Sequence, residues 1–314
     1  MDAIYNSVTA FGPGSIGNLT VGFDVVGMCL QSPGDLVTIS TETDRTYISE
    51  IIGDSGRLPL AISENTAGIA VLAYLRAINS HQHVSIRLVK QMPLGSGMGS
   101  SGASAVAAVL AVNHLFGSPM SKHELTQFVL EAEGASSGSV HGDNVLPSLL
   151  GGIILINSYE PLSYRKLPIP SFLHYGLIHP HLEIKTAEAR SILPSSITRQ
   201  AAIRQMGLLA GFTSALYESD RQGLSEYLHD VIAEPVRASL MPYLSGCRTT
   251  AMELNAIHCG ISGSGPSLFT LWDTIEAAEQ GSKALAAELA KQNIGSEYYF
   301  GAVNQQGAYI VEAR

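Results

Sequence analysis

A run of small residues at positions 93–103 is the part of the sequence whose residue types most clearly indicate chemistry. A β-branched segment at 84–90 precedes this run and an alanine- and valine-rich segment follows it, which predicts a strand, a loop and a helix in that order. Glycines let a backbone approach a phosphate closely, and the N–H groups that open a helix favour an anion. The pattern predicts a phosphate-binding loop made of Pro93, Leu94, Gly95, Ser96, Gly97, Met98, Gly99, Ser100, Ser101, Gly102 and Ala103.

Other kinds of glycine loop share part of this pattern. Gly97, Gly99 and Gly102 spell the G-x-G-x-x-G of dinucleotide-binding folds. Those folds need an acidic residue at the end of a second strand about twenty residues later, and residues 118–133 show no strand pattern. The G-K-[ST] of a P-loop does not follow the glycines. A tight loop that only lets a helix pack closely is the purely structural alternative.

The full run resembles the phosphate loop of the GHMP small-molecule kinases, whose pattern is P-x-x-x-G-L-G-S-S-x-A, with Met98 in the place of leucine. Residues 260–267, Gly-Ile-Ser-Gly-Ser-Gly-Pro-Ser, are by composition a flexible glycine turn. They also resemble the third motif of that family, which packs against the phosphate site. The two resemblances together imply that the chain binds ATP at this loop.

Four further blocks resemble the homoserine kinases within that family. Residues 13–27 resemble the first motif, P-A-S-S-A-N-L-x-x-G-F-D-x-x-G, and residues 133–147 resemble E-(x)7-H-x-D-N-V-A-P. Residues 185–194 and 230–237 resemble two later segments of these kinases. All blocks occur along this chain in the same order as in the family. The first block departs from its pattern at Gly14, Ile16 and Gly17. The resemblance implies ATP-dependent phosphorylation of the side-chain hydroxyl of L-homoserine.

The resemblance also implies Mg²⁺ as cofactor, held by Glu133 and a loop serine, for which we expect Ser101 rather than Ser100. A hard dication prefers oxygen ligands, and one carboxylate with phosphates and water suits Mg²⁺. Without the resemblance, Glu133 would more simply be an exposed residue at a helix end. Asn65 opens a helical pattern, so it either caps that helix or borders the adenine pocket, and the sequence leaves both open.

The implied acceptor is a zwitterionic amino acid, which needs binding groups of both charges. Arginine binds an α-carboxylate through two parallel hydrogen bonds, and Arg190 and Arg237 stand where the family places its arginines. Asp24 with Asn18 would accept hydrogen bonds from the α-ammonium. The implied substrate side is completed by His141, Asp143, Asn144 and Thr186.

The catalytic residues that the resemblance implies are Asn18, Glu133 and His141. Asn144 stands where some GHMP relatives carry an aspartate beside the acceptor hydroxyl, so we expect no strong side-chain base. The proton would pass late to phosphate or water, while Asn18 and the loop stabilise the charge of the transition state. His141 is the alternative base.

The segments that must position these residues alternate irregularly between strands and helices. Apolar and β-branched runs predict strands at 35–41, 84–90, 152–157, 172–178 and 267–272. Helical periodicity predicts helices at 65–78, 101–115, 124–133, 201–217 and 275–291. These elements predict an α/β or α+β protein. The resemblance implies the α+β, two-domain GHMP-kinase fold. We expect a ribosomal S5 domain 2-like α/β domain at 1–160 and a ferredoxin-like α+β domain at 161–314, since prolines at 161, 168 and 170 are predicted to interrupt regular structure.

The composition of the chain argues against several other classes of protein. A net charge of −9 argues against general nucleic-acid binding, and 46% hydrophobic residues predict a globular chain. The N-terminus lacks a signal-peptide pattern, and the most apolar run, 103–115, is too short to span a bilayer. Three widely spaced cysteines suit a reducing cytoplasm. We expect a cytoplasmic enzyme without nucleic-acid or membrane partners, and the resemblance implies a homodimer.

Two alternative functions stay open at the level of sequence. A related GHMP kinase would act on mevalonate, shikimate or a sugar, none of which carries an α-ammonium group. A protein of the same fold could instead bind its ligand without catalysis. Intact loop serines, Glu133 and both arginines argue against the second alternative.

Overall fold

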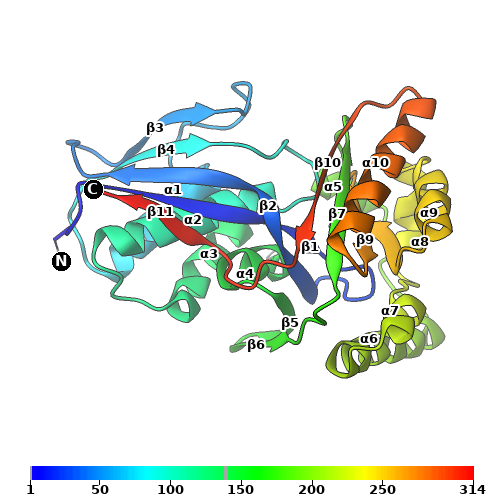
Figure 1. Cartoon of the computed structure of the whole chain (residues 1–314). Helices are drawn as coiled ribbons and strands as arrows, with labels where there is room; N and C mark the ends of the chain where they lie inside the picture. Colours follow the sequence, from blue (N-terminus) through cyan, green and yellow to red (C-terminus); the bar gives the residue numbers. More distant parts are fainter. Residues whose placement is uncertain (1, 138–140) are drawn as a thin grey trace.

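The computed structural model describes residues 2–137 and 141–314, which form two β-sheets with helices packed against them (Figure 1). The first sheet has the strand order β11-β1-β2-β4-β3, and β5 and β6 extend it from β2. Only β3 and β4 pair in parallel among its described strands. The strands are β1 (Ser7–Gly17), β2 (Val26–Ser40), β3 (Tyr47–Ile52), β4 (Ser85–Val89), β5 (Ile153–Tyr159), β6 (Leu162–Leu167) and β11 (Tyr309–Ala313).

Four helices cover one face of this sheet (Figure 1). They are α1 (Thr66–Ala77), α2 (Ser100–Leu115), α3 (Lys122–Ser137) and α4 (Gly142–Leu150). Fourteen of the sixteen residues of α2 are buried, because the helix lies between the sheet and its neighbouring helices. Its composition of alanine, valine and leucine on all sides is typical of such a central helix.

The second sheet has four antiparallel strands in the order β10-β7-β9-β8. Its strands are β7 (His174–Pro180), β8 (His258–Ile261), β9 (Leu268–Trp272) and β10 (Ser296–Ala302), and α9 (Leu244–Glu253) and α10 (Ile275–Lys291) pack with it. This strand order with two crossover helices confirms the expected ferredoxin-like arrangement. The segment between β7 and α9 adds α5 (Thr186–Ser191), α6 (Arg199–Glu218), α7 (Arg221–Tyr227), α8 (Glu234–Arg237) and the 3₁₀ helix η1 (Ala238–Leu240).

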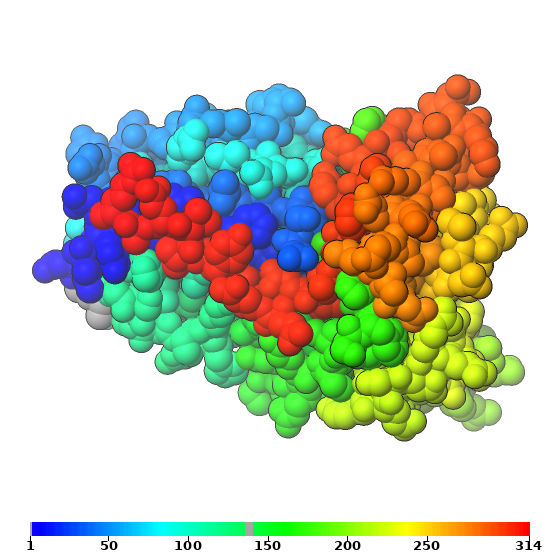
Figure 2. Space-filling view, viewed as in Figure 1, coloured from blue at the N-terminus to red at the C-terminus, as the bar shows by residue number. Residues whose placement is uncertain are grey.

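All five predicted strands and all five predicted helices are present, as β2, β4, β5, β7 and β9 and as α1, α2, α3, α6 and α10. The interruption expected at the three prolines is only partial, because residues 162–167 form strand β6. Pro161 and Pro168 flank β6 rather than interrupt it, and β6 pairs with β5. Two strands beyond residue 160, β6 and β11, join the first sheet, and Figure 2 shows the C-terminal segment in red along the surface of that half. The division after residue 160 stays a prediction.

Within residues 2–137 and 141–314, no helix combines the length and the apolar character that crossing a bilayer requires.

Candidate active site

The loop that joins β4 to α2 lies against the second glycine-rich segment. Gly97 has a φ of +77°, and a Cβ added there would stand 2.5 Å from the carbonyl oxygen of Ser262, so only glycine fits. Ser262 Oγ donates a hydrogen bond to Gly97 O at 2.8 Å, and Ser267 N donates to Ser96 O at 3.2 Å. Since α2 begins at Ser100, the N–H groups of its first turn are available to an anion at this place.

A buried ion pair supports the loop from below. Lys90 directly follows β4 and contacts Asp35 of β2, and the two side chains are only 2% and 0% exposed. Lys90 Nζ also donates to Ser100 O at 2.9 Å and to Ser104 Oγ at 2.7 Å. Burial lowers the pKa of the Lys90 ammonium, and the charge of Asp35 opposes that shift. The pair ties the first turn of α2 to the central strands, and sequence reasoning missed it because neither residue belongs to a motif.

We expect Lys90→Met to lower the free energy of unfolding by about 3 kcal/mol, because Asp35 would stay buried without its counter-charge. Urea unfolding followed by circular dichroism measures this loss. Arg87→Met is the matched control, since Arg87 lies on the adjoining strand and its ion pair with Glu50 is half-exposed; its loss should stay below about 1 kcal/mol. Equally small losses in the two variants would contradict the supporting role of the buried pair.

A cavity of about 150 Å³ opens beside the loop and is lined by both halves of the molecule. Every residue predicted for the acceptor side lines it, so the structure brings the whole predicted set together. These residues are Asn18, Asp24, His141, Asp143, Asn144, Thr186, Arg190 and Arg237. Glu133, Gly263 and Ser264 also line this cavity, and Thr186 Oγ1 lies 3.5 Å from Ser264 Oγ.

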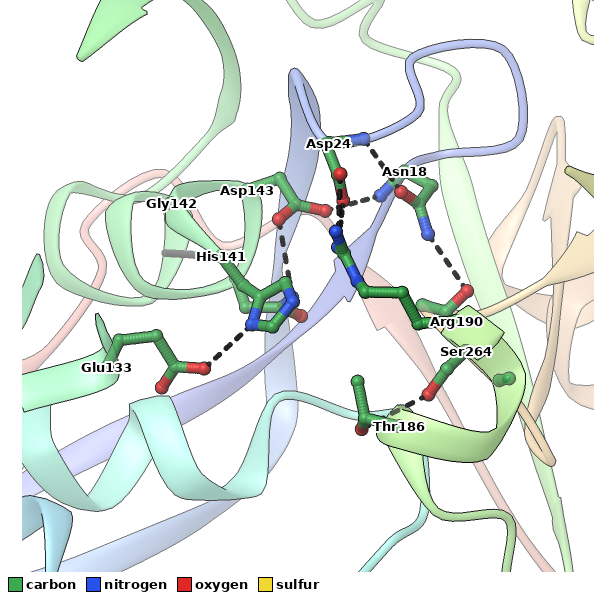
Figure 3. Close-up of polar contacts among 12 residues, drawn as sticks. Asn18, Asp24, Glu133, His141, Gly142, Asp143, Thr186, Arg190 and Ser264 are labelled. Carbon is green, nitrogen blue, oxygen red and sulfur yellow. Dashed lines mark hydrogen bonds and ion pairs between the residues drawn. The ribbon is translucent and has the colours of Figure 1, made fainter. Parts of the chain in front are cut away.

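Opposite charges lie side by side in this cavity. Arg190 donates to both carboxylate oxygens of Asp24, at 2.8 and 3.0 Å (Figure 3). Arg237 is 4% exposed and donates to the carbonyl oxygen of Gly263 at 3.0 Å. The ring of Phe23 lies 5.9 Å from the guanidinium carbon of Arg190 and 5.1 Å from that of Arg237, within reach of cation–π attraction. This part of the cavity therefore offers the carboxylate of Asp24 and two guanidinium groups to a ligand.

Asn18 reaches the cavity from a strained turn between β1 and β2. Asn18, Leu19 and Thr20 have φ values of 67°, 40° and 58°, a left-handed run that residues with a Cβ rarely adopt. Asn18 N donates to Asp143 Oδ2 and Asn18 Nδ2 donates to Gly263 O, both at 2.9 Å. The turn thus fixes the Asn18 amide between the two halves of the site.

The acidic side of the cavity contains groups with shifted pKa values. Glu133 Oε1 lies 3.1 Å from His141 Nδ1, and this hydrogen bond raises the pKa of His141 (Figure 3). Asp143 is almost fully buried, and burial, followed by the negative charge of Asp24, raises the pKa of its carboxyl to about 6. Asp143 therefore gains a proton far more readily than an exposed aspartate.

A second cavity of about 390 Å³ adjoins the first. The two share the walls formed by Gly95, Ser100, Ser101, Glu133, His141 and Thr186. Its further walls include Leu58, Pro59 and Leu88, which suit a flat apolar group. Asn65 lines this cavity and also caps α1, because its side chain accepts a hydrogen bond from Ala67 N at 3.1 Å. The phosphate loop thus stands where a larger and a smaller cavity meet.

The residues of the predicted loop lie in different surroundings. Seven of them line the smaller cavity, namely Gly95, Ser96, Gly97, Gly99, Ser100, Ser101 and Gly102. Met98 and Ala103 are wholly buried in the core, Leu94 lines the larger cavity, and Pro93 borders a separate pocket on the surface. Met98 and Ala103 thus shape the loop from the core, and a contact of theirs with ATP stays a prediction.

The oxygen atoms around the shared walls fit a hard dication. Glu133 supplies a carboxylate, and Ser100 and Ser101 supply hydroxyl groups on the same walls. Ser101 Oγ donates to Thr66 Oγ1 at 3.2 Å. Ser100 Oγ is buried and has no hydrogen-bond partner among the described residues, which makes Ser100 a candidate ligand beside the predicted Ser101.

Comparison with known proteins agrees with this architecture. Residues 65–152 match the model of the GHMP kinases N terminal domain, and residues 212–291 match that of the GHMP kinases C terminal domain. The homoserine kinase of Chloroherpeton thalassium is 42% identical, over 97% of this chain and 99% of that protein. The homoserine kinase of Chlorobium phaeovibrioides is 40% identical, over 97% of this chain and 99% of its own length.

A solved structure has the same fold over almost its whole length. The homoserine kinase from Cytophaga hutchinsonii superposes with a TM-score of 0.96 and is 40% identical. The superposition covers 99% of each chain. The two-domain fold predicted from the motifs is thereby confirmed.

Proposed function

The chain belongs to the homoserine kinase family of the GHMP kinases, and on this basis we propose that it transfers the γ-phosphoryl group of ATP to the side-chain hydroxyl of L-homoserine. The products are ADP and O-phospho-L-homoserine, in the phosphorylation step of threonine biosynthesis. The proposal rests on one arrangement: Asp24 lies beside Arg190 and Arg237 in a cavity at the phosphate loop. A zwitterionic amino acid complements these charges.

The acceptor is proposed to bind with its two charged groups beside Asp24, Arg190 and Arg237. Arg190 bonds to Asp24. The α-carboxylate of L-homoserine would bind to the guanidinium groups of Arg190 and Arg237. The α-ammonium would bind to Asp24 and to the side chain of Asn18. The reacting hydroxyl would then point toward the loop, and the remaining walls would be His141, Asp143, Asn144 and Thr186.

ATP is proposed to lie along the loop with its adenosine in the larger cavity, beside Asn65. The loop N–H groups and the N-terminus of α2 would hold the phosphates, since phosphoryl transfer depends on positioning and on stabilisation of charge. Bound Mg²⁺ would neutralise charge on the β- and γ-phosphates. Glu133 would hold it together with Ser101 or Ser100, and His141 would orient the Glu133 carboxylate through their 3.1 Å hydrogen bond.

We propose that the acceptor hydroxyl loses its proton late, to phosphate or water, without a strong side-chain base. Asn144 supports this proposal, because an amide cannot act as a base and its Oδ1 already accepts a hydrogen bond from Ser15 Oγ at 3.1 Å. Asn18 would stabilise the negative charge that develops in the transition state. His141 is the alternative base, although its Nδ1 is engaged with Glu133.

A screen of acceptors tests the proposed function. ADP release is measured with purified protein, ATP and Mg²⁺, and with L-homoserine, mevalonate, shikimate or galactose as acceptor. We expect Mg²⁺-dependent release only with L-homoserine, because the other acceptors lack the α-ammonium that Asp24 would bind. Turnover of a non-amino acceptor without turnover of L-homoserine would overturn the choice of substrate, and ATP binding without any ADP release would indicate a binding protein.

The buried Asp143 makes the reaction sensitive to pH. Its pKa is raised to about 6, so its carboxylate is ionised above that pH and protonated below it. The protonated form loses the negative charge near the α-ammonium site and accepts more weakly from Asn18 N. We expect kcat/KM for L-homoserine to fall about tenfold per pH unit below about pH 6. A pH profile that stays flat for L-homoserine down to pH 5 would contradict this role.

We also propose that the enzyme acts in the cytoplasm as a homodimer, without nucleic-acid or membrane partners. Its thiols at Cys29, Cys247 and Cys259 are buried, which suits a reducing compartment. Its net charge of −9 disfavours binding to nucleic-acid phosphates. Sedimentation equilibrium of the full chain measures the oligomeric state.

A further inference from the structure

One polar side chain stands on the buried face of α6. Gln205 is 9% exposed, and the other buried residues of this helix are Phe212, Ala215 and Leu216. A polar group in such a place is costly unless its hydrogen bonds are satisfied. The partners of the Gln205 amide therefore indicate why a polar residue stands there.

The Gln205 amide joins two loops that are far apart in the sequence. Its Nε2 donates to Val21 O at 2.6 Å, and its Oε1 accepts from Val231 N at 3.0 Å. Val21 lies in the turn that carries Asn18 and Asp24, and Val231 begins the segment that leads to Arg237. One side chain thus connects the two loops that bring opposite charges into the acceptor cavity.

The first of these loops needs support from outside. Its left-handed run at Asn18, Leu19 and Thr20 persists only where surrounding groups hold it. From β8, His258 Nε2 lies 2.7 Å from Thr20 Oγ1, and from α6, Gln205 holds the next residue along the turn. The turn is therefore held partly by residues of the second half of the chain, and its Asp24 side chain also bonds to Arg190 there.

The second loop leads directly into the helix that ends at Arg237, so its position determines where Arg237 lies. The Asp230 carboxylate accepts hydrogen bonds from the N–H groups of residues 232, 233 and 234, which begins the four-residue helix α8. Arg237 is the last residue of that helix. A shift at Val231 would therefore move the guanidinium group relative to Asp24.

We propose that Gln205 is a positioning residue that sets the separation between Asp24 and Arg237 and so the fit of the acceptor. Gln205 is not among the described residues that line the cavity, so it acts through the two loops rather than on the substrate. The identity of the acceptor in this proposal rests on the proposed function. The bridge between the loops rests on the hydrogen bonds alone.

The variant Gln205→Met tests the proposal, because methionine has a similar length and lacks both hydrogen bonds. We expect KM for L-homoserine to rise about tenfold, since a small displacement of binding groups weakens a preorganised site strongly. The KM for ATP should stay within about twofold of wild type, because the two hydrogen bonds of the Gln205 amide go to Val21 and Val231 rather than to the phosphate loop.

A matched control separates positioning from general stability. Asn113 of α2 is 2% exposed, and its amide also bridges backbone groups, with Nδ2 donating to Met120 O at 2.9 Å and Oδ1 accepting from Met120 N at 3.2 Å. Asn113→Leu should lower the midpoint of thermal unfolding as Gln205→Met does. It should leave the ratio of the two KM values at the wild-type value.

Hydrogen exchange reports the bridge without any substrate. In Gln205→Met, peptides covering residues 18–24 and 230–237 should both exchange faster, while Asn113→Leu should leave both unchanged. Unchanged exchange in either loop, or an equal rise of both KM values, would overturn the proposal. If the wild-type protein did not turn over L-homoserine, the proposed function would fail, and the exchange comparison would still decide whether Gln205 holds the loops together.

Discussion

Replacing Glu133 by glutamine should lower kcat about a thousandfold, because the side chain would keep its size but lose the charge that is proposed to hold Mg²⁺ at the phosphates. Glu133 is 7% exposed and lines both cavities beside the loop. The hydrogen bond to His141 can persist through the amide oxygen, so the fold of the site should survive. ADP release at saturating ATP and L-homoserine, repeated over a range of Mg²⁺ concentrations, measures the change.

The control for this variant lies on the same helix. Glu131 of α3 is half-exposed and pairs with Arg76 on the surface, so Glu131→Gln should leave kcat within about twofold of wild type. Activity of Glu133→Gln within a few fold of wild type at every Mg²⁺ concentration would remove Glu133 from the proposed metal site.

Replacing Arg237 by methionine should lower kcat/KM for L-homoserine about a thousandfold, mainly through KM. Arg237 is 4% exposed, so the α-carboxylate would lose a partner in a site with little water to replace it. Lysine should restore only part of the loss, because it keeps the charge without the planar fork that binds a carboxylate through two hydrogen bonds. Steady-state kinetics with each substrate varied in turn separates this effect from a loss of ATP binding.

An exposed arginine provides the comparison for Arg237. Arg221 pairs with Asp273 on the surface, with side chains 43% and 41% exposed, and Arg221→Met should leave both KM values near those of wild type. A rise of the KM for ATP as large as that for L-homoserine in Arg237→Met would contradict the assignment of Arg237 to the acceptor.

Most residues that line the smaller cavity could be singled out from the sequence, because they belong to short blocks with distinctive spacing. The phosphate loop needs glycine, serine and a following helix within a few residues, and such a local requirement is visible in the sequence. The acceptor residues are spread from Asn18 to Arg237, and only the order of the resembling blocks united them. The structure places all of them around one cavity.

The supports of the site could not be predicted, because their partners are distant in the sequence. In the sequence, nothing distinguishes Lys90 and Asp35 from other charged residues. Only the pairing of β2 with β4 brings them together beneath α2. In the sequence, Gln205 is one polar position in a helical pattern. Its partners are backbone atoms of Val21 and Val231, and the side chains of these residues do not indicate such contacts. Such contacts depend on the folded chain rather than on local composition.

Strand β6 was missed for a different physical reason. Proline lacks an N–H group and disfavours the interior of a strand, so a segment with several prolines predicts a break. Here Pro161 and Pro168 stand just outside the strand Leu162–Leu167, where no ladder hydrogen bond is lost. The spacing between the prolines left room for a short strand, and proline content alone did not reveal it.

The identity of the phosphorylated product decides whether this chain is a homoserine kinase. Purified protein is incubated with ATP, Mg²⁺ and L-homoserine, and the products are followed by ³¹P NMR together with ADP release. We expect one new phosphomonoester, identical to authentic O-phospho-L-homoserine, formed in an equal amount to ADP. ADP formed without that phosphomonoester, or no ADP at all in the presence of both substrates, would contradict the proposed function.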